Sequence, residues 1–342
     1  MATRTTPKPT TAWSSPARPG RTLTRRLVAA ALLLAGLLTF AYGGVSIYIA
    51  TQIAWTTPKA IQYTPADFGL KYSSITFPAR EDGVPISGWF IPGILPGGKL
   101  TDQRIIIMVH GARQNRADPA AGVLDIGREL AYNGFAVLSF DMRGHGVSTP
   151  APFSLGYFEY RDVLGAVDFI HHGRLPYPEL GRPKVIGGWG VSMGAATMIF
   201  AAAREPAIAA VVLDCPFADI IPILEREIPK GGGVPAFFTP GGLVASQALY
   251  GTNFYAVRPV DYIAKIAPRP IFLIHGIADK YIPVANHYTL VAAAKAAPNA
   301  NVQAWEVPGA DHAQSFHTLR TEYVAKLLAF YNMALGADSS GG

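Results

Sequence analysis

The sequence predicts a three-layer α/β sandwich, in which helices cover both faces of a mostly parallel central sheet, with one membrane-spanning helix ahead of it. Short apolar runs that alternate with segments of helical spacing predict the sandwich. An uncharged, strongly apolar stretch at residues 27–50 predicts the membrane helix. A serine flanked by glycines at a strand-to-helix junction indicates where a reactive group would lie.

Residues 1–26 are predicted to be a disordered, basic tail, because they are rich in Thr, Pro and Ser. They contain no acidic residue, and their basic residues are Arg4, Lys8, Arg18, Arg21, Arg25 and Arg26. These charges equal the net charge of the whole chain, +6, so the rest of the chain is neutral. A nucleic-acid-binding protein would carry its excess charge on a domain face, and that class is therefore excluded.

Residues 27–50 are long enough, at about 1.5 Å per helical residue, to cross a hydrocarbon core of about 30 Å. The basic tail before them predicts a single-pass signal anchor in the cell membrane, with the N-terminus in the cytoplasm and the folded domain on the outer side. A cleavable signal peptide is the alternative. The apolar stretch is longer than a signal peptide requires and no clear small-x-small site ends it, which favours the uncleaved anchor.

Residues 51–70 are predicted to be a linker and residues 71–336 to be the folded domain. Buried parallel strands are predicted by five runs that are apolar on both faces, at 105–109, 136–140, 185–189, 210–214 and 271–275. Two earlier runs, near 74–77 and 86–90, have no helix between them and predict an antiparallel hairpin at one edge. Helices are predicted at 120–132, about 157–172, 193–204, 284–296 and 315–335.

Residues 217–266 interrupt this alternation, because glycine and proline clusters break them into short apolar pieces. The interval is too long for a plain crossover, and its aromatic residues favour a cap packed over the ends of the strands. A merely structural insertion is the alternative. Residues 337–342 are predicted to be a disordered terminus.

The stretch GGWGVSMGAA, residues 187–196, joins a predicted strand to a predicted helix. A dinucleotide-binding loop is one interpretation, but the glycine spacing is one residue longer than G-x-G-x-x-G and the stretch lies in the middle of the sheet. A nucleophile elbow is the other, since Gly190-x-Ser192-x-Gly194 suits a turn in which only very small residues fit beside the serine. That turn would lift Ser192 Oγ above the sheet at a helix N-terminus, where N–H groups favour developing negative charge.

A serine hydroxyl is a weak nucleophile unless an imidazole takes its proton and a carboxylate orients that imidazole. The sequence HGIADKYIP places Asp279 just past the strand predicted at 271–275. The sequence PGADHAQSF places His312 just past a further strand-like run at 302–307. Because parallel strands end at the same edge of a sheet, we expect these side chains to meet Ser192 there.

Five segments in this order resemble the α/β-hydrolase superfamily, in particular its esterase-like and prolyl-oligopeptidase-like serine hydrolases. They are VHGARQNR (109–116), DMRGHGVS (141–148), GWGVSMG (188–194), HGIADKYIP (275–283) and GADHAQSF (309–316). The resemblance covers roughly residues 70–335 and implies the α/β-hydrolase fold with a catalytic triad of Ser192, Asp279 and His312. It also implies an oxyanion hole made by the backbone N–H groups of Met193 and Ala112.

Other residues compete for these roles. His317 is the alternative base, and Asp214 and Asp219 are alternative carboxylates. Arg113 and Arg116 either bind an acidic substrate group or belong to the ordinary surface. The single cysteine, Cys215, lies in an apolar strand and is interpreted as a buried, inert thiol.

The expected activity is hydrolysis of an ester, thioester or amide acyl bond through an acyl-enzyme on Ser192, with a carboxylic ester hydrolase favoured. An aminopeptidase-like or oligopeptidase-like peptidase and a catalytically inactive binding protein are the alternatives. The expected partners are a small-molecule or peptide acyl substrate and, through residues 27–50, the membrane. No cofactor is predicted, and no metal, because no cluster of histidine, cysteine or carboxylate residues has ligand spacing. The oligomeric state is left open.

Overall fold

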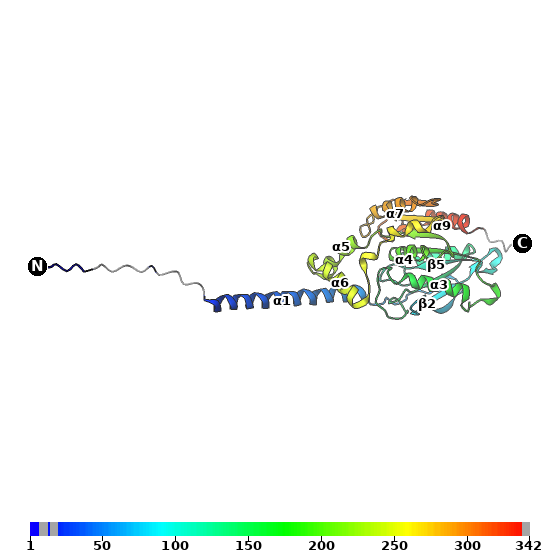
Figure 1. The fold of residues 1–342 in the computed structure, drawn as a ribbon. Helices are drawn as coiled ribbons and strands as arrows, with labels where there is room; N and C mark the ends of the chain where they lie inside the picture. Colours follow the sequence, from blue (N-terminus) through cyan, green and yellow to red (C-terminus); the bar gives the residue numbers. More distant parts are fainter. Residues whose placement is uncertain (7–12, 14–19, 337–342) are drawn as a thin grey trace. The chain divides into compact units, whose positions relative to one another are not determined.

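The computed structural model describes residues 1–6, 13 and 20–336. Of the predicted tails, residues 7–12, 14–19 and 337–342 therefore lie outside the described residues. The chain forms two compact units, Met1–Val45 and Ser46–Gly342. The second unit contains the whole α/β domain (Figure 1).

The central sheet has eight strands in the order β1-β2-β6-β5-β7-β8-β9-β10. In that order they span Ser73–Pro78, Pro85–Ile91, Ala136–Phe140, Arg104–Val109, Val185–Val191, Ile208–Asp214, Ile271–Gly276 and Val302–Val307. β2 runs antiparallel to β1 and β6, and every other pair is parallel. The predicted sheet and its edge hairpin are confirmed. A separate two-stranded ribbon pairs β3 (Gly93–Ile94) with β4 (Leu100–Thr101).

Helices cover both faces of this sheet. They are α2 (Val123–Tyr132), α3 (Tyr160–His172), α4 (Met193–Ala202), α7 (Ala285–Lys295), α8 (Ser315–Thr318) and α9 (Arg320–Leu335). Successive residues of β7 identify the layers, because neighbouring side chains of a strand point to opposite faces. A Cβ on Gly187 would meet Tyr331 and Leu335 of α9, whereas a Cβ on Gly188 would meet Met198 of α4.

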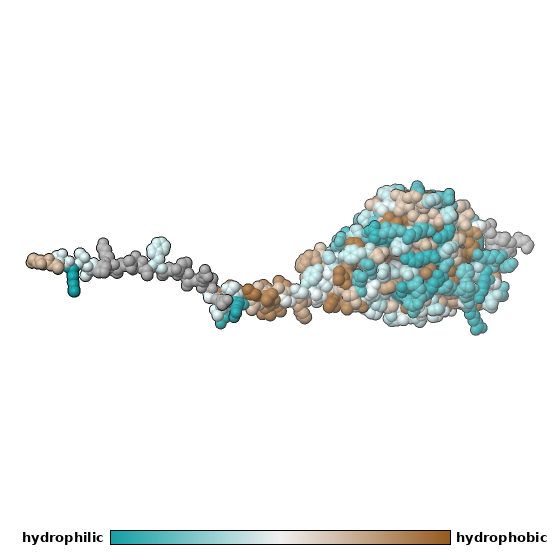
Figure 2. Space-filling model, viewed as in Figure 1, coloured by the Kyte–Doolittle hydropathy of each residue, from teal (hydrophilic) through white to brown (hydrophobic). Residues whose placement is uncertain are grey.

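The first helix, α1 (Arg21–Ala54), is longer than predicted at both ends. Residues 21–26 were expected in the disordered tail, and residues 51–54 in the linker. The C-terminal extension has a tertiary cause: Ile53 and Ala54 are buried, and Ala54 O accepts a hydrogen bond from the Phe153 N–H, at 2.9 Å. The part of α1 from Thr22 to Ala54 is long and apolar enough to cross a membrane. Figure 2 shows hydrophobic residues, in brown, along this helix.

The interval predicted as a cap, residues 217–266, folds as two helices with one short 3₁₀ turn between them and three more after the second helix. The helices are α5 (Ile221–Gly232) and α6 (Thr239–Tyr250), and the turns are Ala236–Phe238, Phe254–Ala256, Pro259–Asp261 and Ile263–Ile266. α6 packs against the end of α1, since a Cβ on Gly242 would lie 2.4 Å from Ile49 Cγ2. The hydroxyls of Thr51 and Tyr250 also lie 3.2 Å apart.

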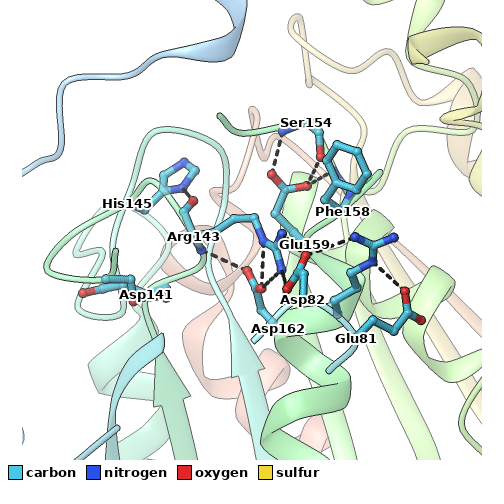
Figure 3. A network of polar contacts seen from close by, with 12 residues as sticks. Glu81, Asp82, Asp141, Arg143, His145, Ser154, Phe158, Glu159 and Asp162 are labelled. Atoms are coloured by element: carbon cyan, nitrogen blue, oxygen red, sulfur yellow. Dashed lines mark hydrogen bonds and ion pairs between the residues drawn. The ribbon is translucent and has the colours of Figure 1, made fainter. Parts of the chain in front are cut away.

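A buried network of charges fixes the loop that follows β6 (Figure 3). The guanidinium of Arg143 binds Asp162 at 2.7 Å and Asp82 at 2.7 Å. The carboxylate of Glu159 accepts hydrogen bonds from the Ser154 N–H and Oγ, at 2.6 and 2.7 Å. Arg143, Ser154, Glu159 and Asp162 are buried, whereas Asp82 lies at the surface. The buried contacts hold the loop between them against the domain.

Candidate active site

Ser192 lies between the last residue of β7 and the first residue of α4. Its φ of 55° and ψ of −122° are strained for a residue with a side chain. The flanking glycines explain how the turn is possible: a Cβ on Gly190 would lie 2.5 Å from Gly194 O, and one on Gly194 would lie 2.2 Å from Val109 O. No side chain fits at either position without a shift of the backbone around it.

The structure brings Ser192, His312 and Asp279 together from three separate strand ends. Ser192 Oγ lies 2.9 Å from His312 Nε2. His312 Nδ1 lies 2.7 Å from Asp279 Oδ2. The serine and the carboxylate are buried, while the imidazole side chain is 21% exposed, so it faces the space where a substrate would bind.

Asp279 is held in place by donors to both of its oxygens. Oδ1 accepts hydrogen bonds from the backbone N–H groups of Tyr281 and Ile282, at 2.8 and 2.7 Å. His275 Nε2 lies 3.5 Å from Oδ2, on which His312 also converges. Burial alone would raise the pKa of Asp279, but the hydrogen bonds from His275 and His312 and the charge of His312 lower it to about 2. Asp279 is therefore an anion at neutral pH.

The competing residues are bound elsewhere. Asp214 Oδ1 accepts a hydrogen bond from Ser315 Oγ at 2.9 Å, and burial raises the pKa of Asp214 to about 6. Asp219 forms an ion pair with Arg258. His317 belongs to α8, where its Nε2 lies 2.9 Å from Pro119 O. Among the described residues, no side-chain hydrogen bond joins either alternative carboxylate or the alternative base to Ser192 or His312, and Asp214 contacts Ser192 only through its backbone oxygen, which accepts the Ser192 N–H at 2.8 Å.

Two backbone amides border Ser192. Met193 N belongs to the first turn of α4, and the loop after β5 passes close by, since a Cβ on Gly111 would lie 3.6 Å from Ser192 Cβ. Ala112 follows directly on that loop. Within residues 20–336, neither the Met193 N–H nor the Ala112 N–H donates a hydrogen bond to a protein acceptor. The residues proposed for the oxyanion hole therefore present free donors.

Two buried histidines, His110 and His145, brace this loop. His110 Nε2 accepts from the Met142 N–H at 3.1 Å, and its Nδ1 donates to Gly111 O at 2.7 Å. His145 Nε2 accepts from the Arg113 N–H at 3.1 Å. Burial lowers the pKa of His110 to about 3, so this ring stays neutral and keeps its acceptor nitrogen.

A cavity of about 740 Å³ opens beside Ser192 and His312. Its volume is typical of a site for a small molecule. Arg113 lines it, but Arg116 does not. Arg116 is buried over the ring of Trp89, 4.3 Å from its centroid, and lies 3.8 Å from Asp141. Of the two arginines considered for an acidic substrate group, only Arg113 can contact one here.

Among the described residues, Cys215, Asp279 and His312 form a group whose potential metal-ligand atoms lie within 4.8 Å of one another. Two of the three are already paired with each other. Burial raises the pKa of the Cys215 thiol well above its usual value, which opposes the thiolate that a metal requires. The buried position of Cys215 agrees with its interpretation as an inert thiol.

Comparison with known proteins gives the same fold. The family model of the alpha/beta hydrolase fold matches residues 104–239. YfhR of Salmonella typhimurium, an uncharacterised protein, is 28% identical over 307 residues, which cover 86% of this chain and 93% of YfhR. The esterase Pf2001 of Pyrococcus furiosus aligns with a TM-score of 0.67 and 24% identity, over 83% of this chain and 99% of the esterase. The acylaminoacyl peptidase of Pyrococcus horikoshii aligns with a TM-score of 0.56 and 14% identity, over 82% of this chain and 45% of the peptidase.

Proposed function

We propose that the chain, whose residues 104–239 match the model of the alpha/beta hydrolase fold, is a serine hydrolase that cleaves an ester, thioester or amide through an acyl-enzyme on Ser192. The observation that carries this proposal is the 2.9 Å contact between Ser192 Oγ and His312 Nε2. At that distance the imidazole can take the hydroxyl proton as the oxygen attacks a carbonyl carbon.

In the first half of the reaction, His312 Nε2 accepts the proton of Ser192 while Oγ forms a bond to the acyl carbon. The carbonyl oxygen becomes an oxyanion, which the N–H groups of Met193 and Ala112 would stabilise. One such donor contributes about 10²- to 10³-fold in rate. When the tetrahedral intermediate collapses, the bond to the leaving alcohol, thiol or amine breaks, and His312 returns the proton to it.

In the second half, a water molecule attacks the acyl carbon and gives a proton to His312, which passes it to Ser192 as the acid is released. Asp279 has two functions in both halves. Its Oδ2 accepts the hydrogen of His312 Nδ1, which fixes the tautomer, and its negative charge stabilises the imidazolium that forms. The low pKa of Asp279, about 2, keeps that charge in place.

A carboxylic ester is the favoured substrate bond. The esterase Pf2001 aligns over nearly its whole length, whereas the acylaminoacyl peptidase aligns over 45% of its own. Kinetics on chain 46–342, which lacks the first compact unit, would test this. We expect turnover of p-nitrophenyl butyrate that is lost in Ser192→Ala by at least about 10⁴-fold. Aminoacyl arylamides are tested beside the p-nitrophenyl ester. A preference for the arylamides would identify a peptidase, and a folded protein that turned over neither kind of substrate would be a binding protein.

We also propose that α1 is an uncleaved anchor, with the N-terminus in the cytoplasm and the hydrolase domain on the outer side. The six basic residues within 1–26 support this orientation. Protease treatment of sealed cells would test it. Digestion of the domain from outside is expected, and a protected domain would contradict the proposed orientation.

A further inference from the structure

The last turns of α1 form one wall of the cavity beside Ser192. Tyr48, Ile49, Gln52 and Ile53 line this wall. Ile49 and Ile53 are buried against the domain, whereas Tyr48 is 51% exposed. All of these residues belong to the same compact unit as Ser192. The helix that is able to cross a membrane therefore also shapes the space where the substrate binds.

With α1 as the proposed anchor, the position of this wall along the helix puts it just beyond the bilayer core. A bilayer core takes about 20 helical residues, and the uncharged stretch begins at Leu27, so the core ends close to Ser46. Before that point the large side chains of α1 are uncovered, with Leu33 67% and Phe40 83% exposed, and Ser46 is the first buried residue of the helix. Tyr48 follows about 3 Å further along the helix axis.

The cap presents an uncharged surface next to this helix end. No residue from 231 to 257 is charged. Three apolar side chains of this segment are more than half exposed: Phe237 62%, Val244 62% and Leu249 52%. α6, which carries Val244 and Leu249, packs against α1 through Gly242. Exposed apolar groups beside an apolar helix suit the interface of a bilayer better than water.

Apolar side chains form a large part of the cavity wall and can hold a hydrocarbon chain, while Arg113, Asp118, Glu227 and Lys230 also line it. Ile223, Leu224 and Ile228 of α5 line it, and Phe153 and Leu155 come from the loop after β6. The lining residues that are also exposed mark its opening, and they are Tyr48, Gln52, Arg113, Ala120, Lys230, Gly231, Gly232 and Tyr281. One side of the opening is therefore formed by the end of α1 and the end of α5.

We propose that the natural substrate is a long-chain acyl ester of an amphiphile that resides in the membrane. This inference rests on the proposed serine hydrolase activity and on the proposed membrane anchor. The acyl chain passes from the bilayer between Tyr48 and the C-terminal end of α5, and the apolar walls hold it with its carbonyl carbon at Ser192 Oγ. Hydrolysis adds one water across the ester bond and releases a fatty acid and the alcohol part of the amphiphile.

The test uses the full chain reconstituted in vesicles of diether phosphatidylcholine, which contains no ester bond. Turnover of 4-methylumbelliferyl palmitate held in the vesicles is compared with turnover of soluble 4-methylumbelliferyl butyrate. Two variants probe the two parts of the inference. Val244→Asp with Leu249→Asp charges the exposed face of α6, and Gly231→Trp narrows the opening at a position with no atom within 4 Å of a new Cβ. Met333→Asp, at a residue 54% exposed on α9, is the matched control.

We expect the ratio of palmitate to butyrate turnover to fall about tenfold in both variants, because each hinders transfer of a chain from the bilayer, and to stay unchanged in Met333→Asp. An unchanged ratio in both variants, or butyrate turnover without palmitate turnover in the wild-type chain, would overturn this inference and leave the proposed function standing. If the folded wild-type chain turned over neither the palmitate nor the butyrate ester and was not labelled by a fluorophosphonate, the proposed function itself would be overturned.

Discussion

Asp279 shows how much of this site depends on one carboxylate. Its two oxygens receive the N–H groups of Tyr281 and Ile282 on one side and His312 on the other. The burial that would otherwise neutralise it is outweighed by these donors. Asp214, one strand away, has the opposite balance, since burial raises its pKa to about 6. Two neighbouring carboxyls are thus expected to be unequal in catalysis.

Asp279→Asn tests that difference. The amide keeps the volume of the carboxylate but removes its charge and favours the wrong tautomer of His312, so kcat for p-nitrophenyl butyrate should fall about 10³- to 10⁴-fold. Asp214→Asn is the matched control, because Asp214 does not contact His312 in this structure, and its kcat should change far less. A larger loss in Asp214→Asn than in Asp279→Asn would assign the role to Asp214.

The raised pKa of Asp214 also predicts a pH dependence of stability. Its folded-state pKa of about 6 lies above the ordinary value of 3.8, so the folded state binds this proton more tightly. That contribution is complete below pH of about 4 and is lost as the pH rises to about 6, an effect of about 3 kcal/mol. Urea unfolding should therefore show the wild-type chain losing stability relative to Asp214→Asn between these two pH values. If the free energies of unfolding of the wild-type chain and of Asp214→Asn changed in parallel with pH, the raised pKa of Asp214 would be contradicted.

At the scale of elements, the elbow between β7 and α4 depends on close backbone contacts. A methyl group at Gly194 would collide with the backbone oxygens of Val109 and His110, at 2.2 and 2.4 Å. Gly194→Ala should therefore lower the free energy of unfolding by about 3 kcal/mol or more. Gly127→Ala, inside α2, is the control. Its new Cβ would lie at an ordinary contact distance, 3.7 Å from Met108 Sδ of β5, so the substitution should stabilise the helix by about 0.5–1 kcal/mol. Equal effects in urea unfolding would refute this account of the turn.

The elements that the sequence predicts well are those whose signal is local. The strands are recognisable because a parallel strand buried on both faces is an uninterrupted apolar run, as in β5, where every residue from Ile105 to Val109 is apolar and buried. Helix ends are less well predicted. The helix predicted at 120–132 begins only at Val123, as α2. The residues before it form a turn, in which the Asp118 carboxylate accepts a hydrogen bond from the Ala120 N–H. The end of α1 at Ala54 depends on contacts with α6, which lies far along the chain.

At the scale of the whole molecule, the order of the motifs predicts which side chains meet, because parallel strands end at one sheet edge. On that basis the sequence predicts that Ser192, Asp279 and His312 lie close together, and in the structure His312 contacts both other side chains. The cavity walls could not be predicted in this way. They combine the end of α1, α5 and the loop after β6, and no periodic pattern of residues records that these segments are neighbours.

This organisation predicts where the chain tolerates truncation. Chain 46–342 keeps the second compact unit whole and should retain soluble ester turnover. Chain 55–342 also loses Ile49 and Ile53, whose burial is worth about 1.5–3 kcal/mol each, and it should unfold at a clearly lower urea concentration. Equal midpoints for the two chains would show that the end of α1 contributes nothing to the domain.

The most direct test of the central claim is covalent labelling by a fluorophosphonate, followed by peptide mapping of the intact folded chain. An alcohol activated by His312 should form one adduct on Ser192, and both Ser192→Ala and His312→Ala should prevent it. Labelling at another residue, or an adduct on Ser192 that forms equally fast without the imidazole of His312, would contradict the account.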